Sequence, residues 1–332
     1  MNMKSDDERL RELFEIKEKP NFNKTIQKAK IFSIIRTTIV SLMVFIIASF
    51  VVFSLNATIL NEISNKEQNN LEAWYNIAMP NAFLGCVQVD DRIMVGELDY
   101  TRYRYLGNKP IIDGSYKDGY SYMYLINGIY GDLENYLFDR SGKSEKDLNE
   151  AQAYNKAGKK VMKFYDPSVN YENYTNDLKK LDEIEGNKLM EISLSFDKAY
   201  DFEEVKNMIP SNITLNWYWV DTFTENSEDS LNKFIFDEYD VHGIKALDGE
   251  GKSLENPEKD FINVITRCKN NKDYSSEYQK LFDILSNGKS EINKEDLKII
   301  GVVVSGDRNS LKALKDKNYI KAATIGAVAD KY

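Results

Sequence analysis

Two aspartates, Asp197 and Asp307, each stand two residues after a serine, where a predicted strand ends. Two carboxylates brought together by a fold could act as general acid and general base, for instance in a cell-wall hydrolase. A simpler interpretation makes each aspartate the N-cap of a helix, because a short helical pattern follows both. We favour capping for both residues.

Other residue types that carry chemistry are sparse. His242 is the single histidine, so a Ser-His-Asp triad would have to include it, and the Gly243 that follows favours a turn. The two cysteines, Cys86 and Cys268, could form one disulfide, but we favour two separate buried thiols. The sequence contains no phosphate-binding loop, nucleophile elbow, C-x-x-C or H-E-x-x-H motif. It therefore predicts no catalytic residue, no metal and no cofactor.

The two aspartates belong to a unit that occurs twice in the C-terminal part of the chain. Each copy reads as a strand, a Ser-x-Asp sequence, a short helix and a second strand. The copies cover strand 189–196, helix 202–208 and strand 213–220, then strand 297–305, helix 310–317 and strand 320–328. Two β-α-β units predict an α+β fold with a ferredoxin-like sandwich in residues 186–332. Residues 221–290 would be a mostly helical insertion, with helices over 260–269 and 274–285.

Strand 213–220 has two faces with different predicted roles. Trp217 and Trp219 share a face with Ile213 and Leu215, which predicts core packing. Asn216 and Tyr218 point the other way and are predicted to form an outer contact site. The preceding residues 81–185 are predicted to form a β-rich subdomain, with strands over 83–89, 93–105 and 161–164 and helices over 144–156 and 171–181.

Residues 37–55 form a run of 19 residues without a charge. At about 1.5 Å per residue, such a helix can cross a hydrocarbon core of about 30 Å. A signal peptide is the rival interpretation, but its apolar region is usually shorter and closer to the N-terminus. We interpret the run as a retained transmembrane helix, followed by a helical connector over residues 56–80.

Charge predicts the orientation of this helix. Residues 17–36 contain six Lys or Arg side chains, whereas residues 56–75 contain one, Lys66. Lys and Arg are retained on the cytoplasmic side, so the N-terminus is predicted to be cytoplasmic and residues 56–332 extracytoplasmic. The tail carries +3 and the rest −12. The basic flank suits anionic membrane lipid, and the acidic part does not favour a nucleic acid partner.

The cytoplasmic tail, residues 1–36, is too short to bury a core of its own. Leu10, Leu13 and Phe14 are spaced as on one helix face, and Ile16 widens the stripe. This stripe could lie on the bilayer, remain disordered or dock on a partner as a helix in a groove. From about Asn23 a second helix is predicted to run unbroken into the apolar segment.

Several long motifs carry a resemblance to a known family. They are residues 192–200 (ISLSFDKAY) with 203–205, residues 215–221 (LNWYWVD), residues 300–307 (IGVVVSGD) with 311–314, and residues 28–30 and 157–167 (AGKKVMKFYDP). In these motifs the chain resembles the Gram-positive membrane anti-sigma factors, which combine a sigma-factor regulator N-terminal region with a sigma-factor regulator C-terminal domain. The resemblance covers most of the chain.

The resemblance implies a single-span protein whose tail holds an extracytoplasmic-function sigma factor at the membrane until an envelope signal reaches the outer domain. With it, we expect Leu10, Leu13, Phe14 and Ile16 to bind the sigma factor, and a further small membrane protein is a candidate partner. The tail has no Cys or His, so it is not a zinc-containing anti-sigma domain. The alternative is a membrane-anchored binding or adaptor protein for envelope components that has no transcription partner.

Overall fold

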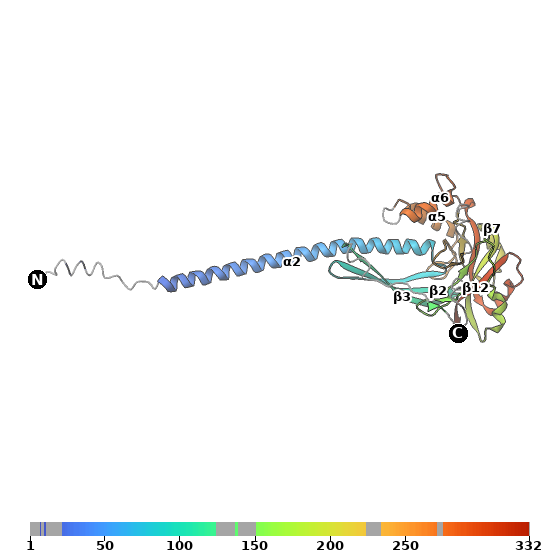
Figure 1. Cartoon of the computed structure of the whole chain (residues 1–332), viewed down its shortest axis with the longest axis horizontal. Helices are drawn as coiled ribbons and strands as arrows, with labels where there is room; N and C mark the ends of the chain where they lie inside the picture. Colours follow the sequence, from blue (N-terminus) through green and yellow to red (C-terminus); the bar gives the residue numbers. More distant parts are fainter. Residues whose placement is uncertain are drawn as a thin grey trace. The chain divides into compact units, whose positions relative to one another are not determined.

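The computed structural model describes residues 7, 10, 22–123, 137–138, 151–223, 234–270 and 275–331. The chain divides into two compact units, residues 1–59 and 60–332. A long apolar helix is followed by antiparallel sheets with short helices, which is an α+β architecture (Figure 1).

Helix α2 (Phe22–Ile77) is continuous over 56 residues, as predicted from about Asn23 onward. Within the helix, the Thr37 and Thr58 hydroxyls donate to the carbonyl oxygens of Ser33 and Ser54 at 2.9 and 3.0 Å. The apolar side chains of the first unit are exposed around the helix. Among the described residues, α2 is the helix long and apolar enough to span a membrane or to act as a signal sequence.

The second unit begins with a three-stranded antiparallel sheet. Its order is β1-β2-β3, formed by β1 (Ala82–Asp91), β2 (Val95–Leu106) and β3 (Lys109–Ser121). Gly107, at φ +58°, opens the tight turn between β2 and β3, a conformation that glycine adopts without strain. Leu98 and Tyr100 pack with Tyr75 near the end of α2 in one core, and Figure 1 shows β2 and β3 beside this end of the helix.

The main sheet has five antiparallel strands in the order β10-β8-β11-β7-β12. They are β7 (Lys188–Asp201), β8 (Thr214–Val220), β10 (Gly243–Lys245), β11 (Lys298–Asp307) and β12 (Ile320–Asp330). Both copies of the repeat are present, joined by α3 (Phe202–Met208) in the first and by α7 (Arg308–Leu311) and η4 (Lys312–Leu314) in the second. The copies interleave, because β11 lies between β7 and β8 while β7 lies between β11 and β12.

Both faces of this sheet are buried. On one face Ile192, Leu194 and Val302 join the large core that includes α3, α5 (Pro257–Cys268) and α6 (Ser275–Ser286). On the other face Trp217 and Trp219 pack with Val303 and with the short paired strands β6 (Lys163–Phe164) and β9 (Phe236–Asp237). The core position predicted for the two tryptophans is therefore confirmed.

The segment between the two copies is less helical than predicted. Helices α5 and α6 are present, but β9 and β10 also form, and β10 extends the main sheet at its edge. Gly243 makes this pairing feasible, because a Cβ there would collide with the Tyr218 carbonyl oxygen and the Trp217 ring. A three-residue strand is too short to show a pattern of alternating apolar residues.

Three predicted helices need correction. In the segment 144–156, the described residues from Ala151 onward contain β5 (Ala153–Tyr154), paired with β4 (Leu137–Phe138). Asn155 ends this strand, because its Oδ1 accepts the N–H groups of Ala157 and Lys159. The helix predicted over 171–181 is the 3₁₀ helix η2 (Asp177–Glu183), and the one over 310–317 is reduced to α7 and η4.

Candidate functional site

The sigma-binding stripe predicted in the tail falls mostly outside the described residues. Leu10 is helical, and half of its surface is exposed. Leu13, Phe14 and Ile16 lie outside the described residues, so their role in binding a partner stays a prediction.

Asn216 and Tyr218, predicted as an outer contact site, are buried. Asn216 Nδ2 donates to Asn81 Oδ1 and to the Tyr105 carbonyl oxygen, both at 3.0 Å. Tyr218 packs against the Phe202 ring at a centroid distance of 4.6 Å. Because the sheet is covered on both faces, neither side chain presents a surface to a partner. Alternation along one strand separates its two faces but does not reveal what covers each of them.

The two aspartates are far apart and have different roles. Asp307 caps α7, since its Oδ1 accepts the Ser310 N–H at 2.9 Å; this bond and the Lys331 ammonium lower its pKa to about 2. Asp197 is no cap, because β7 continues to Asp201, and it accepts instead from the Tyr200 hydroxyl at 2.7 Å. Asp307 pairs with Leu189, eight residues before Asp197, which corresponds to roughly 25 Å along the strand. The two carboxylates therefore form no acid–base pair.

His242 packs inside the protein, and the two cysteines are not bonded to each other. The His242 ring packs edge-on against Trp74 at 5.5 Å, and burial lowers its pKa to about 4, so the ring is neutral near pH 7. Cys86 and Cys268 are both free, the first exposed and the second buried. The two thiols are therefore separate, as predicted, but the predicted burial holds for Cys268 and is wrong for Cys86.

A buried network of charges joins the three-stranded sheet to the main sheet. Arg104 of β2 binds Asp113 at 2.8 Å, Glu191 of β7 at 3.0 Å and Glu238 at 2.6 Å. Arg102 also binds Asp113, at 2.6 Å. All five side chains are buried. Burial raises the pKa of the Glu191 carboxyl, and the charge of Arg104 acts in the opposite direction. Such a network holds the two sheets in one arrangement, because breaking any pair leaves a buried charge uncompensated.

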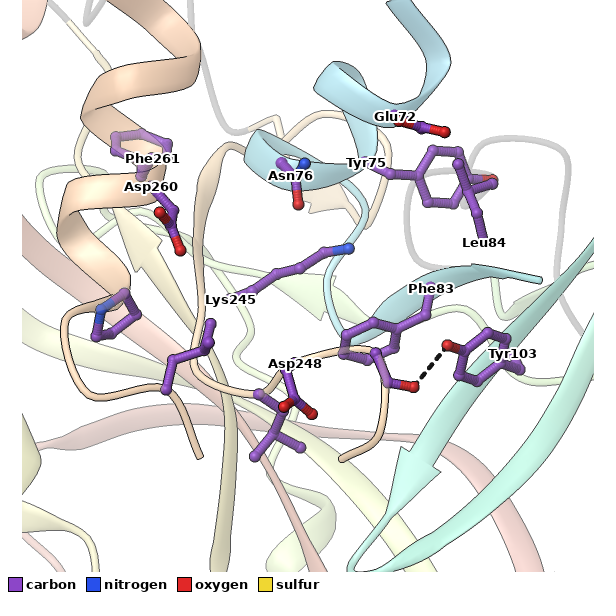
Figure 2. A pocket seen from close by; sticks show the side chains of 14 residues that line it. Glu72, Tyr75, Asn76, Phe83, Leu84, Tyr103, Lys245, Asp248, Asp260 and Phe261 are labelled. Atoms are coloured by element: carbon purple, nitrogen blue, oxygen red, sulfur yellow. Dashed lines mark hydrogen bonds between the residues drawn. The ribbon is translucent and has the colours of Figure 1, made fainter. Parts of the chain in front are cut away.

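The unit 60–332 also contains a pocket of about 350 Å³ (Figure 2). Its walls come from the end of α2, from β1 and β2, from β10 with the loop that follows it, and from the first turn of α5. The aromatic rings of Tyr75, Phe83, Tyr103 and Phe261 line it. The Tyr103 hydroxyl donates to the Gly249 carbonyl oxygen at 2.8 Å, which holds the loop after β10 against β2. This volume lies at the lower end of the range typical of small-molecule sites.

Lys245, the last residue of β10, extends across this pocket toward the end of α2 (Figure 2). Its ammonium nitrogen lies 4.5 Å from the centre of the Phe83 ring. Burial lowers the pKa of Lys245 to about 7, since the apolar walls remove water from the charged form. Sequence analysis missed this residue. Its position between Ile244 and Ala246, in an otherwise apolar stretch, was the available signal.

Three carboxylates face the same pocket. Glu72 of α2 and Asp260 of α5 are exposed at its edge. Asp248 accepts the N–H groups of Glu250 and Lys252 at 2.9 and 2.8 Å, and these bonds lower its pKa. The pocket therefore combines one cation, three anions and aromatic walls.

Comparison with protein families identifies both halves of the chain. A family model described as Sigma factor regulator N-terminal matches residues 23–111, and one described as Sigma factor regulator C-terminal matches residues 181–327. The chain belongs to the sigma factor regulators. This family is regulatory and not catalytic, and its domains imply a sigma factor as partner. Neither the curated proteins nor the solved structures compared with the chain match it.

In this sigma factor regulator, the pocket and the charge network both join the two matched regions. The N-terminal match includes Arg104, Phe83 and Tyr103, whereas the C-terminal match includes Glu191 and Lys245. All of these residues belong to the compact unit 60–332. The second unit of the regulator is therefore a single body built from both domains.

Proposed function

We propose that the chain is a single-span membrane anti-sigma factor, which sequesters an extracytoplasmic-function sigma factor through residues 1–36 and responds to envelope signals through residues 60–332. The observation that carries the proposal is the match of both sigma factor regulator domains to a chain with one long apolar helix. A short tail before this helix and a large unit after it are the parts that signalling across a membrane requires.

The charge distribution supports a cytoplasmic tail. The six Lys and Arg side chains of residues 17–36 would lie next to the anionic inner leaflet, with the acidic remainder outside. Helix α2 is continuous from Phe22 to Ile77. This continuity offers a route by which a change in the outer unit could alter the presentation of the tail.

The apolar stripe supports docking of the tail. Leu10, Leu13, Phe14 and Ile16 would insert into a groove of the sigma factor and cover surface that it needs for transcription.

The arrangement of the main sheet supports a ferredoxin-like fold for residues 186–332. Two interleaved strand–helix–strand copies in one antiparallel sheet are what that fold requires, with β10 as an additional edge strand.

A transcription reporter tests the proposed function. We expect deletion of residues 1–21 to raise expression from a promoter that depends on the partner sigma factor. The same deletion in a strain without that sigma factor should have no effect. Deleting residues 186–332 while keeping 1–60 should alter the response to envelope stress but preserve sequestration. Unchanged expression after deletion of the tail would favour the second candidate, a membrane-anchored binding protein, for which the pocket at Lys245 is the supporting observation.

A further inference from the structure

We propose that the pocket at Lys245 binds a small zwitterion, such as a free amino acid or a dipeptide. The carboxylate of this ligand would pair with Lys245, and its ammonium group would lie among Glu72, Asp248 and Asp260. This inference concerns the unit 60–332 alone and does not depend on whether the tail binds a sigma factor.

Lys245 supplies the site for a carboxylate. Its ammonium group contacts the Phe83 ring at 4.5 Å, and no carboxylate of the described residues lies within 4.0 Å of it. The contrast with Lys294 is informative, since that lysine contacts the buried carboxylate of Glu258 at 3.3 Å. A desolvated cation gains strongly from an anion, and in this pocket the anion has to come from a ligand.

The three carboxylates exclude a ligand that carries only negative charge. Glu72, Asp248 and Asp260 outnumber the single cation of the pocket, so a simple anion would be repelled at the entrance. A simple cation would in turn meet Lys245. A ligand with both charges meets a partner at each end, which favours a zwitterion over either ion.

The walls and the size suit a small ligand with a short apolar part. Phe83 and Leu84 of β1 and Leu247 and Leu254 after β10 provide apolar surface. The Asn76 side chain near the end of α2 adds an amide that can donate or accept (Figure 2). A pocket of about 350 Å³ accommodates an amino acid or a dipeptide but not a protein segment of several residues.

The test is calorimetric titration of the full-length chain in detergent micelles. The probes are leucine and dialanine in both chiral forms, with N-acetyl-leucine, which lacks the ammonium group, and leucine amide, which lacks the carboxylate. We expect a zwitterionic probe to bind at least tenfold more tightly than either blocked compound. If no zwitterion binds, or if N-acetyl-leucine binds as well as leucine, the proposal is wrong.

Variants assign the two ends of the ligand. Lys245→Met should weaken binding at least tenfold and Asp260→Asn severalfold. Lys252→Met is the matched control, because Lys252 lies in the loop that follows β10 but is exposed and paired with Glu250, and it should leave binding unchanged. Thermal unfolding of each variant verifies that it is folded. Equal binding by folded Lys245→Met and by the unaltered chain would overturn the assignment of the carboxylate to Lys245.

Proton uptake provides a second readout. The titratable groups that line the pocket with Lys245 are Glu72 and Tyr75 of α2, Tyr103 of β2, Asp248 in the loop after β10 and Asp260 of α5. At pH 8 the free lysine is mostly neutral, and a bound carboxylate restores its charge, so the complex takes up a proton. The heat of binding should then depend on the ionisation enthalpy of the buffer, and this dependence should vanish in Lys245→Met. A heat independent of the buffer at pH 8 would contradict the pairing.

Discussion

Lys245 carries an ammonium group in a place where the charge is costly. Its pKa falls from 10.5 to about 7 on folding, so between these values the unfolded chain holds a proton that the folded chain lacks, and stability rises with pH. We predict that Lys245→Met raises the free energy of unfolding by on the order of 2 kcal/mol at pH 6. This gain in the free energy of unfolding of Lys245→Met over the unaltered chain should shrink as the pH rises from 7 to 10.

Urea unfolding followed by tryptophan fluorescence measures this difference, since Trp217 and Trp219 are fully buried. Lys252→Met, at an exposed position, is the control and should show no such dependence on pH. A constant difference between Lys245→Met and the unaltered chain from pH 6 to pH 10 would mean that Lys245 titrates normally.

Asp307 and Asp197 allow the contribution of a helix cap to stability to be measured. Both follow a Ser-x sequence, but only Asp307 caps a helix. We predict that Asp307→Ala costs about 1 kcal/mol of stability, the usual effect of a lost cap. Asp197→Ala should cost less, since it removes one bond to the Tyr200 hydroxyl at the surface. Chemical denaturation of the two variants measures the difference. Equal losses would show that the capping bond at Asp307 contributes nothing beyond a surface contact.

At the scale of elements, the clearest prediction concerns Arg104, the buried arginine between the two sheets. Arg104→Met removes the arginine that binds Glu191 and Glu238 and one of the two arginines that bind Asp113, and breaking a buried pair costs about 3–5 kcal/mol. Arg92→Met is the control, because Arg92 pairs with Asp90 at the surface and should cost less than about 1 kcal/mol. Denaturant midpoints of both variants test this, and similar midpoints would show that the network does not join the sheets.

The elements also show where sequence reasoning works. Long strands such as β7 and β11 have apolar runs or alternation over many residues, and both were predicted, as was the 56-residue helix α2. Strand β10 and the pocket were missed for one physical reason. Lys245 acquires its environment from α2, β1, β2 and α5, which are distant in sequence, and a three-residue strand carries no periodic signal of its own.

At the scale of the whole molecule, the proposed topology has residues 60–332 outside the cell. Cys86 is free and exposed, whereas Cys268 is free and buried. A membrane-impermeant maleimide added to intact cells should therefore label the chain at Cys86, and Cys86→Ser should abolish the labelling. A cysteine introduced at Ser5 in that background should react only after the membrane is permeabilised. Labelling of Ser5→Cys in intact cells, with Cys86 protected, would reverse the topology.

The central claim is that the tail captures a sigma factor. The affinity of the purified sigma factor for the full-length chain tests this claim most directly. Leu13→Asp places a charge in the stripe formed by Leu10, Leu13, Phe14 and Ile16, whereas Leu13→Met keeps the apolar contact and serves as the control. We predict micromolar or tighter binding of the purified sigma factor to the chain in detergent micelles, at least a tenfold loss for Leu13→Asp and little change for Leu13→Met. Equal binding by all three chains, or binding that survives deletion of residues 1–21, would contradict the account.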